Sequence, residues 1–403
     1  MSLAVAGEGS SMGRPRPASR LLALAGLGIV LLSGVPTAAA HGGGHYLPGV
    51  HQWYALVPLL GGLGVVAAGV FLRRSDYAVG VGRLLTVVFF GLVVAAFGAV
   101  ALVQLSPVLS LNVSQRPLTS ETLTAFRLIA GVAVIAGSFA VGRLRWPERP
   151  RYAVLGVLLG AWVVYPAAFD NLGLQSSVNP AGYVLFASVL AGVAYIAYRD
   201  ARHALAALAA DPLARRFGVA VGLLAAVFFM FSAGILIIFP DPTGNISWAH
   251  SFVRVLPVKD PLVYWPAVEF WFPSLPLTGY LSLGMMALVL SLAALVGVNA
   301  AIVAYQWHCR DDAGFNGAAG AAAIAAPNAC CCCGPVLSQL AVVALGPTAA
   351  MPFYWLFIDV SSPFGVLFFA ASFALLLGNL VRFANAVTPT VADAAPNAAD
   401  APA

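Results

Sequence analysis

The sequence predicts an all-α fold: a polytopic helical membrane protein with about nine transmembrane helices after a signal peptide. Three observations predict this class. Of the 403 residues, 61% are apolar and 9% are charged, whereas a soluble globular domain carries about 25% charged residues. The apolar residues gather into runs of roughly 20, the length that crosses a hydrocarbon core as a helix. The basic residues concentrate in alternate segments between these runs, as they do in membrane proteins of fixed orientation.

The chain begins with a segment typical of a secretory signal peptide. Three arginines precede the apolar run LLALAGLGIVLLSGV, and the small-residue stretch PTAAA follows. A basic region, an apolar region and a small-residue cleavage site in this order predict removal of residues 1–40. Cleavage after Ala40 would make His41 the new N-terminus. The alternative is an uncleaved first helix.

Nine apolar runs follow, and we expect them to form a transmembrane domain over 52–383. Most have about the 20 residues that a transmembrane helix needs. The last three are longer and contain Gly or Pro interruptions, which predicts tilted or broken helices. The predicted spans are 52–72, 84–105, 126–142, 152–169, 181–198, 217–239, 276–304, 317–346 and 353–381.

Two segments outside these spans have a distinctive composition. The loop 240–275 is dense in Trp, Tyr and Phe, which favour the membrane–water interface, so we expect short interfacial helices there. The segment 384–403 is rich in Ala and Pro and has no large apolar residue except valines. That composition predicts a disordered cytoplasmic tail.

The basic residues predict which helix ends face the cytoplasm. If the mature N-terminus lies outside and the spans alternate, the outside segments hold Arg116, Arg127, Arg254 and Lys259. The inside segments hold the other sixteen of the 20 basic residues, a positive-inside pattern. We therefore expect a cell-membrane protein with a cytoplasmic C-terminus, and the basic balance needs no nucleic acid. The inside residues are Arg14, Arg16, Arg20, Arg73, Arg74, Arg83, Arg143, Arg145, Arg149, Arg151, Arg199, Arg202, Arg215, Arg216, Arg310 and Arg382.

Four consecutive cysteines lie near the middle of the predicted span 317–346, in the stretch NACCCCGP. The flanking Pro and Gly residues predict a local break of the helix. A break lets adjacent thiols converge, and soft thiolates prefer ions such as Cu(I) and Zn(II). The alternative is packing, since cysteine also behaves as a small hydrophobic residue. The candidate ligands are Cys330, Cys331, Cys332 and Cys333.

The segment 317–346, GAAGAAAIAAPNACCCCGPVLSQLAVVALG, resembles the first helix of the mercuric transport membrane proteins. In that family a small-residue helix leads to a vicinal cysteine pair, a Gly-Pro-type break and an apolar segment ending in Ala-Leu-Gly. The resemblance implies that the pair accepts a soft metal ion within the membrane. Four cysteines instead of two, a far longer chain and the lack of a second inside pair depart from the family, so mercury itself is not implied. The matching residues are Cys332, Cys333, Gly334, Pro335, Ala344, Leu345 and Gly346.

A second group of candidate ligands lies in the predicted extracytoplasmic leader 41–51, which contains His41, His45 and His51. The glycines between them let the segment fold back, so three imidazoles can meet one ion, and imidazole suits Cu, Zn and Ni. An exposed His41 would also chelate copper through its α-amine. This terminus then resembles the histidine brace of copper-binding proteins and copper monooxygenases. The alternative is a polar leader that binds nothing.

Four further candidate ligands lie near the ends of the spans. In the outer aromatic loop, His250 could join the histidine site. At the inside end of the seventh span, His308 and Cys309 predict an exit site for an ion. Asp359 lies about two turns inside the ninth span, a costly position for a carboxylate that favours a role with a cation or proton. The alternatives are an interfacial histidine, a solvated helix end and an aspartate paired with a hydroxyl.

The sequence thus predicts a membrane protein that binds or transports a soft transition metal, with copper as the first candidate, rather than an enzyme. Outer histidines would collect the ion, the cysteines would hold it in transit, and the exit site would receive it. The implied partners are the lipid bilayer and either an extracytoplasmic metal carrier or a membrane partner subunit. Two alternatives are an integral subunit of a copper-dependent membrane oxidoreductase or oxygenase, and a membrane scaffold or sensor without transport. Walker A, GxGxxG and CxxCH motifs do not occur.

Overall fold

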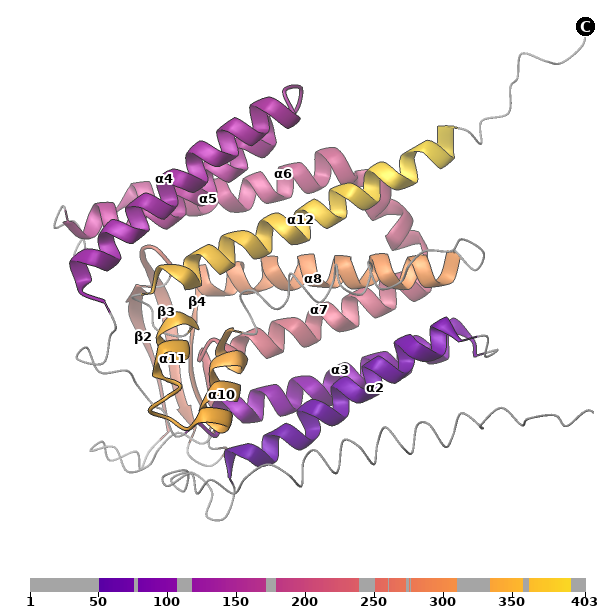
Figure 1. Ribbon diagram of the computed structural model, residues 1–403, viewed down its shortest axis with the longest axis horizontal. Coiled ribbons are helices and arrows are strands. Elements are labelled where there is room, and N and C mark those ends of the chain that lie inside the picture. The colour runs from indigo at the N-terminus through magenta and orange to yellow at the C-terminus, as the bar shows by residue number, and fades with distance from the viewer. Residues whose placement is uncertain are drawn as a thin grey trace, which may run out of the picture. The chain divides into compact units, whose positions relative to one another are not determined.

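Long apolar helices make up most of the computed structural model (Figure 1). It describes residues 51–75, 79–106, 118–171, 179–238, 251–259, 261–272, 275, 277–309, 334–357 and 362–392. Eight of its helices are long and apolar enough to cross a membrane, which confirms the helical, polytopic membrane class. They are α2 (Leu56–Arg74), α3 (Val81–Gln104), α4 (Ser120–Arg145), α5 (Pro150–Asn171), α6 (Pro180–Ala210), α7 (Pro212–Ser232), α8 (Leu283–Cys309) and α12 (Pro363–Ala392).

The last two predicted spans are divided differently from the others. Of span 317–346, the structure describes α10 (Gly334–Leu345), a helix of 12 residues. Span 353–381 consists of α11 (Met351–Phe357) and α12, and Ser362 between them is not helical. Proline at the first position of α12 fits this break, because its ring fixes φ and its missing N–H is not needed there. The helix α12 also continues past residue 383, where we predicted that the tail begins.

The prediction of interfacial helices in 240–275 is wrong for the described part of that loop. Its described residues form β2 and β3 instead, which belong to an antiparallel sheet of order β1-β4-β3-β2. Its strands are rich in aromatic and β-branched residues, which suit a pleated, half-buried surface. One face of β3 is buried through Ala267 and Trp271. The strands are β1 (Leu236–Ile238), β2 (Phe252–Lys259), β3 (Tyr264–Phe272) and β4 (Leu277–Ser282).

Three antiparallel helix pairs, α2–α3, α4–α5 and α7–α8, are the most closely packed helices in the described part of the chain. Glycines allow the approach. A Cβ on Gly62 would lie 2.3 Å from the backbone N of Ala95, and one on Gly218 would lie 2.7 Å from the carbonyl O of Gly297. Small residues at helix interfaces are the usual means of packing in a membrane, where apolar side chains gain little by leaving lipid.

Helices α6 and α12 connect these helix pairs through the largest buried cluster, which includes Phe186, Val189 and Phe373. A polar contact lies within it. The side chain of Asn299 in α8 is fully buried, and its Nδ2 donates to the carbonyl of Leu376 in α12 at 3.1 Å. Asn379 in α12 donates back to Asn299 Oδ1 at 2.6 Å. Such amide bonds between membrane helices satisfy groups that lipid cannot.

The helix ends fall into two groups. At the sheet end, Gln104 at the C-terminus of α3 contacts both α7 and β1: its Nε2 donates to Phe231 O at 3.0 Å, and its Oε1 accepts from Ile238 N at 3.1 Å. At the opposite end, Arg73 at the C-terminus of α2 donates to Trp307 O near the C-terminus of α8 at 3.1 Å. We call this second group of helix ends the arginine end. Its described arginines are Arg73, Arg83, Arg143, Arg145, Arg149, Arg151, Arg199, Arg202, Arg215, Arg216 and Arg382.

Candidate functional site

Most of the predicted ligands lie outside the described residues. These are His41, His45, His250, Cys330, Cys331, Cys332, Cys333 and Asp359. Cys309 is the last residue of α8. The two predicted ligands whose side chains are described, His51 and His308, lie at the sheet end and the arginine end respectively. Among the described residues, no group of three His, Cys, Asp or Glu side chains could hold a metal ion.

His51 adjoins a buried polar contact at the sheet end. It precedes a single 3-10 turn, η1 (Gln52–Ala55), whose N-cap it forms. The His51 side chain is exposed and its ring lies 5.9 Å from that of Tyr54, whereas the next side chain, Gln52, is buried. Nε2 of Gln52 donates to Leu102 O at 2.8 Å and to Oε1 of Gln339 at 2.9 Å. The last histidine of the leader is therefore fixed beside the C-terminal turn of α3.

Gln339 belongs to α10, the helix that follows the cysteine run in the sequence. Its side chain is 2% exposed, and the neighbouring Ser338 donates its hydroxyl to Pro335 O at 2.7 Å. Val336 of α10 shares a buried cluster with Leu59 of α2 and other residues of α2 and α3. The chain that leaves the histidine leader and the chain that leaves the cysteine run thus meet in one buried amide pair.

The sequence analysis missed this amide pair. Gln52 and Gln339 each stand in an apolar stretch, QWYALVP and VLSQLAVV. An amide in such a stretch is costly unless it finds a partner, which is a usable signal. The sequence could not indicate which residue the partner is, because 287 residues separate the two glutamines.

His308, the predicted exit ligand, is paired with Asp211 at the arginine end. Nδ1 of the imidazole lies 2.6 Å from Oδ2 of the carboxylate. Oδ1 of Asp211 accepts from Ala214 N at 2.8 Å, which caps the first turn of α7. Burial alone would raise the pKa of Asp211, but the bonds from Ala214 and His308 outweigh it and hold the pKa below its ordinary value. An ionised Asp211 therefore accepts a bond from the imidazole.

Comparison with protein-family models, with curated proteins and with solved structures gives no match for this chain. The fold defines a class, a polytopic helical membrane protein with an antiparallel sheet at one end of the helices. Any more particular function has to come from the chemistry of its own residues.

Proposed function

We propose that the protein binds a soft transition metal, with copper as the first candidate, and transports it across the membrane. One observation carries the proposal: the bond between Gln52 and Gln339 joins the two parts of the sequence that are richest in metal ligands. Gln52 follows His51 directly, and α10 follows Cys333 directly. Gln339 is five residues from Gly334, or about 7.5 Å of helix rise.

The ligands in this proposal are thiolates and imidazoles, and the amides position them. A carboxamide is a poor ligand for Cu(I), whereas cysteine thiolate is among the best and imidazole is suitable. A buried amide pair holds its two segments in one arrangement, because separating them would leave polar groups unpaired in an apolar site. His41 and His45 would complete the collecting site with His51, and His250 in the outer loop would join it.

The ion's route follows from the charge distribution. The arginine end carries most of the basic residues, which favours its placement in the cytoplasm. The sheet end and the histidine leader would then face outside, as signal-peptide cleavage requires. An ion held by the cysteines would leave towards Cys309 and His308, with Asp359 as a carboxylate on the outer part of the route.

The decisive experiment replaces the four cysteines, Cys330 to Cys333, by serine and measures copper bound to the purified protein by elemental analysis. We expect the loss of most bound Cu(I), because serine keeps the size but lacks the soft sulfur. Cys309→Ser removes one thiol of the proposed exit site, and it should lower bound copper only by the share of that site, so that the copper held by the four cysteines remains. Full copper binding by the quadruple variant would show that the cysteines serve packing.

A flux measurement separates transport from the alternatives. In proteoliposomes loaded with a Cu(I) indicator, the intact protein should carry copper and the quadruple variant should not. Binding without flux would favour a sensor or scaffold. An oxidoreductase subunit would instead depend on His41, His45 and His51 alone and would purify with a partner subunit.

A further inference from the structure

The turn between α4 and α5 presents two arginines that form no ion pair within the described residues. Arg145 ends α4, and Trp146 N–H caps the helix through Gly142 O. Arg149 N donates to Trp146 O at 2.9 Å, which closes a four-residue turn with proline at its second position. The turn lies between two membrane-spanning stretches, Glu121–Arg145 and Pro150–Ala168. Its arginines therefore stand at the edge of the membrane.

Aromatic rings fix the positions of these cations. The Arg145 guanidinium lies 5.8 Å from the centre of the Trp146 ring, in cation–π range. Trp146 meets Tyr152 edge to face, with ring centres 5.6 Å apart. Arg149 Nη1 donates to the Tyr152 hydroxyl at 3.3 Å. Trp and Tyr are the residues that anchor helices at the headgroup level, so both guanidinium groups are held at that depth.

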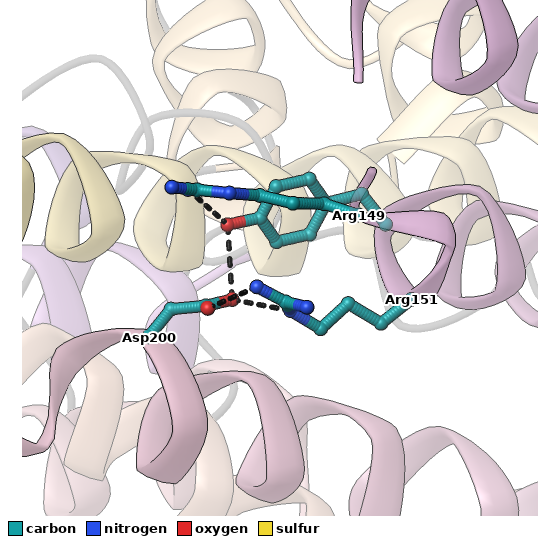
Figure 2. Close-up of polar contacts among 4 residues, drawn as sticks. Arg149, Arg151 and Asp200 are labelled. Atoms are coloured by element: carbon teal, nitrogen blue, oxygen red, sulfur yellow. Dashed lines mark hydrogen bonds and ion pairs between the residues drawn. The ribbon is translucent and has the colours of Figure 1, made fainter. Parts of the chain in front are cut away.

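Two carboxylates lie near these arginines: Glu148, which is exposed in the turn and forms no ion pair with them within the described residues, and Asp200, which is paired with a different arginine. Asp200 of α6 lies with Arg151 and Arg149 in Figure 2, and Nε of Arg151 donates to its Oδ2 at 2.8 Å. The second guanidinium nitrogen of Arg151 contacts Oδ1, so the pair is bidentate. Oδ2 of Asp200 also accepts from the Tyr152 hydroxyl at 2.9 Å. Arg151 forms an ion pair with Asp200. Arg149 reaches that carboxylate only through the Tyr152 hydroxyl and a longer-range attraction, and Arg145 forms no ion pair within the described residues.

An exposed apolar surface continues from these arginines along α4. Leu144 and Arg145 follow Val141 by three and four residues, so all three lie on one side of the helix. The Leu144 side chain is 84% exposed and that of Val141 is 49% exposed. Two cations at the membrane edge beside an apolar face match a ligand with an anionic head and an acyl chain.

We propose that the α4–α5 turn binds an anionic phospholipid, with Arg145 and Arg149 contacting the headgroup phosphate. Val141 and Leu144 contact an acyl chain of the same lipid. Arginine presents its N–H groups in a fixed fork that matches phosphate oxygens. A zwitterionic lipid would gain less, because its own ammonium competes with the guanidinium groups for the phosphate. The turn would thus select the lipid that surrounds this hairpin.

Native mass spectrometry of the delipidated full chain tests this proposal, with phosphatidylglycerol and phosphatidylcholine as probes. We expect wild-type protein to prefer phosphatidylglycerol, and Arg145→Gln/Arg149→Gln to lose about thirtyfold of that affinity. Arg83→Gln/Arg216→Gln is the matched control, because it removes the same charge from exposed positions of α3 and α7 at the arginine end, outside the α4–α5 turn and its contacts. It should keep the preference.

Three outcomes would overturn the proposal. Equal losses in the two double variants would mean that only net charge matters. Displacement of the lipid by millimolar inorganic phosphate would identify a site for the free anion. Equal affinity of the wild-type protein for the two lipids would exclude headgroup selection. This measurement uses only the wild-type protein, so it does not depend on whether a variant folds.

Discussion

Asp211 joins two helices through one carboxylate. Its Oδ1 caps α7 through Ala214 N, and its Oδ2 accepts from His308 of α8. The side chain of Asp211 is 8% exposed and that of His308 is 44% exposed. Because the pair closes the linker between α6 and α7 onto the end of α8, we expect it to contribute to stability as well as to any exit site.

Two substitutions at Asp211 separate its roles. Asp211→Asn keeps an oxygen for the cap but replaces the acceptor that His308 contacts, whereas Asp211→Ala removes both. We expect Asp211→Ala to be less stable than Asp211→Asn by about 1 kcal/mol, the typical value of a lost cap. Thermal unfolding of the purified proteins in detergent measures the difference. Equal stability of the two variants would contradict the capping role.

The pH dependence of this pair has a definite sign. The folded pKa of Asp211 lies below its ordinary value of 3.8, so the ionised form stabilises the fold. That contribution is complete above the ordinary value and is lost as the pH falls through the folded pKa. The stability gap between wild type and Asp211→Asn should therefore be wider at pH 5 than at pH 3. A stability difference that is wider at pH 3 than at pH 5 would contradict the stabilising role of ionised Asp211.

At the scale of elements, hydropathy predicted the long helices because apolar length alone decides whether a helix can cross a membrane. It could not predict the sheet. The stretch YWPAVEFWF is rich in aromatic residues, which suit both an interfacial helix and a strand. The neighbouring strand decides between helix and strand for this stretch. β3 pairs with β2 in a register that places Phe252 opposite Trp271. The three valines of FVRVLPVK, a residue type that favours strands, were the available signal.

Neighbouring glycines in α2 provide a matched test of hairpin packing. A Cβ on Gly62 would lie 2.3 Å from the backbone N of Ala95, whereas one on Gly61 would meet nothing within 4 Å. We expect Gly62→Ala to destabilise the protein by about 1–3 kcal/mol through overpacking. Gly61→Ala should be neutral or slightly stabilising. Unfolding in detergent distinguishes them, and equal effects would contradict the close approach of α2 and α3.

At the scale of the whole molecule, the helix directions bring most of the arginines to one end, as alternation of the spans requires. The candidate site was less predictable. His308 could be singled out, but its partner Asp211 is 97 residues away and is brought close only by the packing of α6, α7 and α8. The histidine leader and the cysteine run remain predictions, although the elements that follow them in sequence are in contact.

Orientation can be tested with two reporters. A reporter fused to the C-terminus should be cytoplasmic, because α12 runs from the sheet end to the arginine end. An epitope inserted between β1 and β2 should react with antibody added outside intact cells. The expectation rests on the excess of basic residues at the arginine end. An external C-terminal reporter with an internal epitope would invert the molecule and, with it, the direction proposed for the ion.

The bond between Asn379 and Asn299 has a consequence for biosynthesis. α8 is made 80 residues before its partner in α12, so the nascent chain carries an incompletely bonded amide in the bilayer until its last helix arrives. A chain truncated after residue 357 would keep that amide and offer membrane proteases a degradation signal. We expect such a chain to turn over rapidly in a pulse-chase experiment. Asn299→Ala in the truncated chain should lengthen its lifetime, although in the full chain the same change removes a stabilising contact.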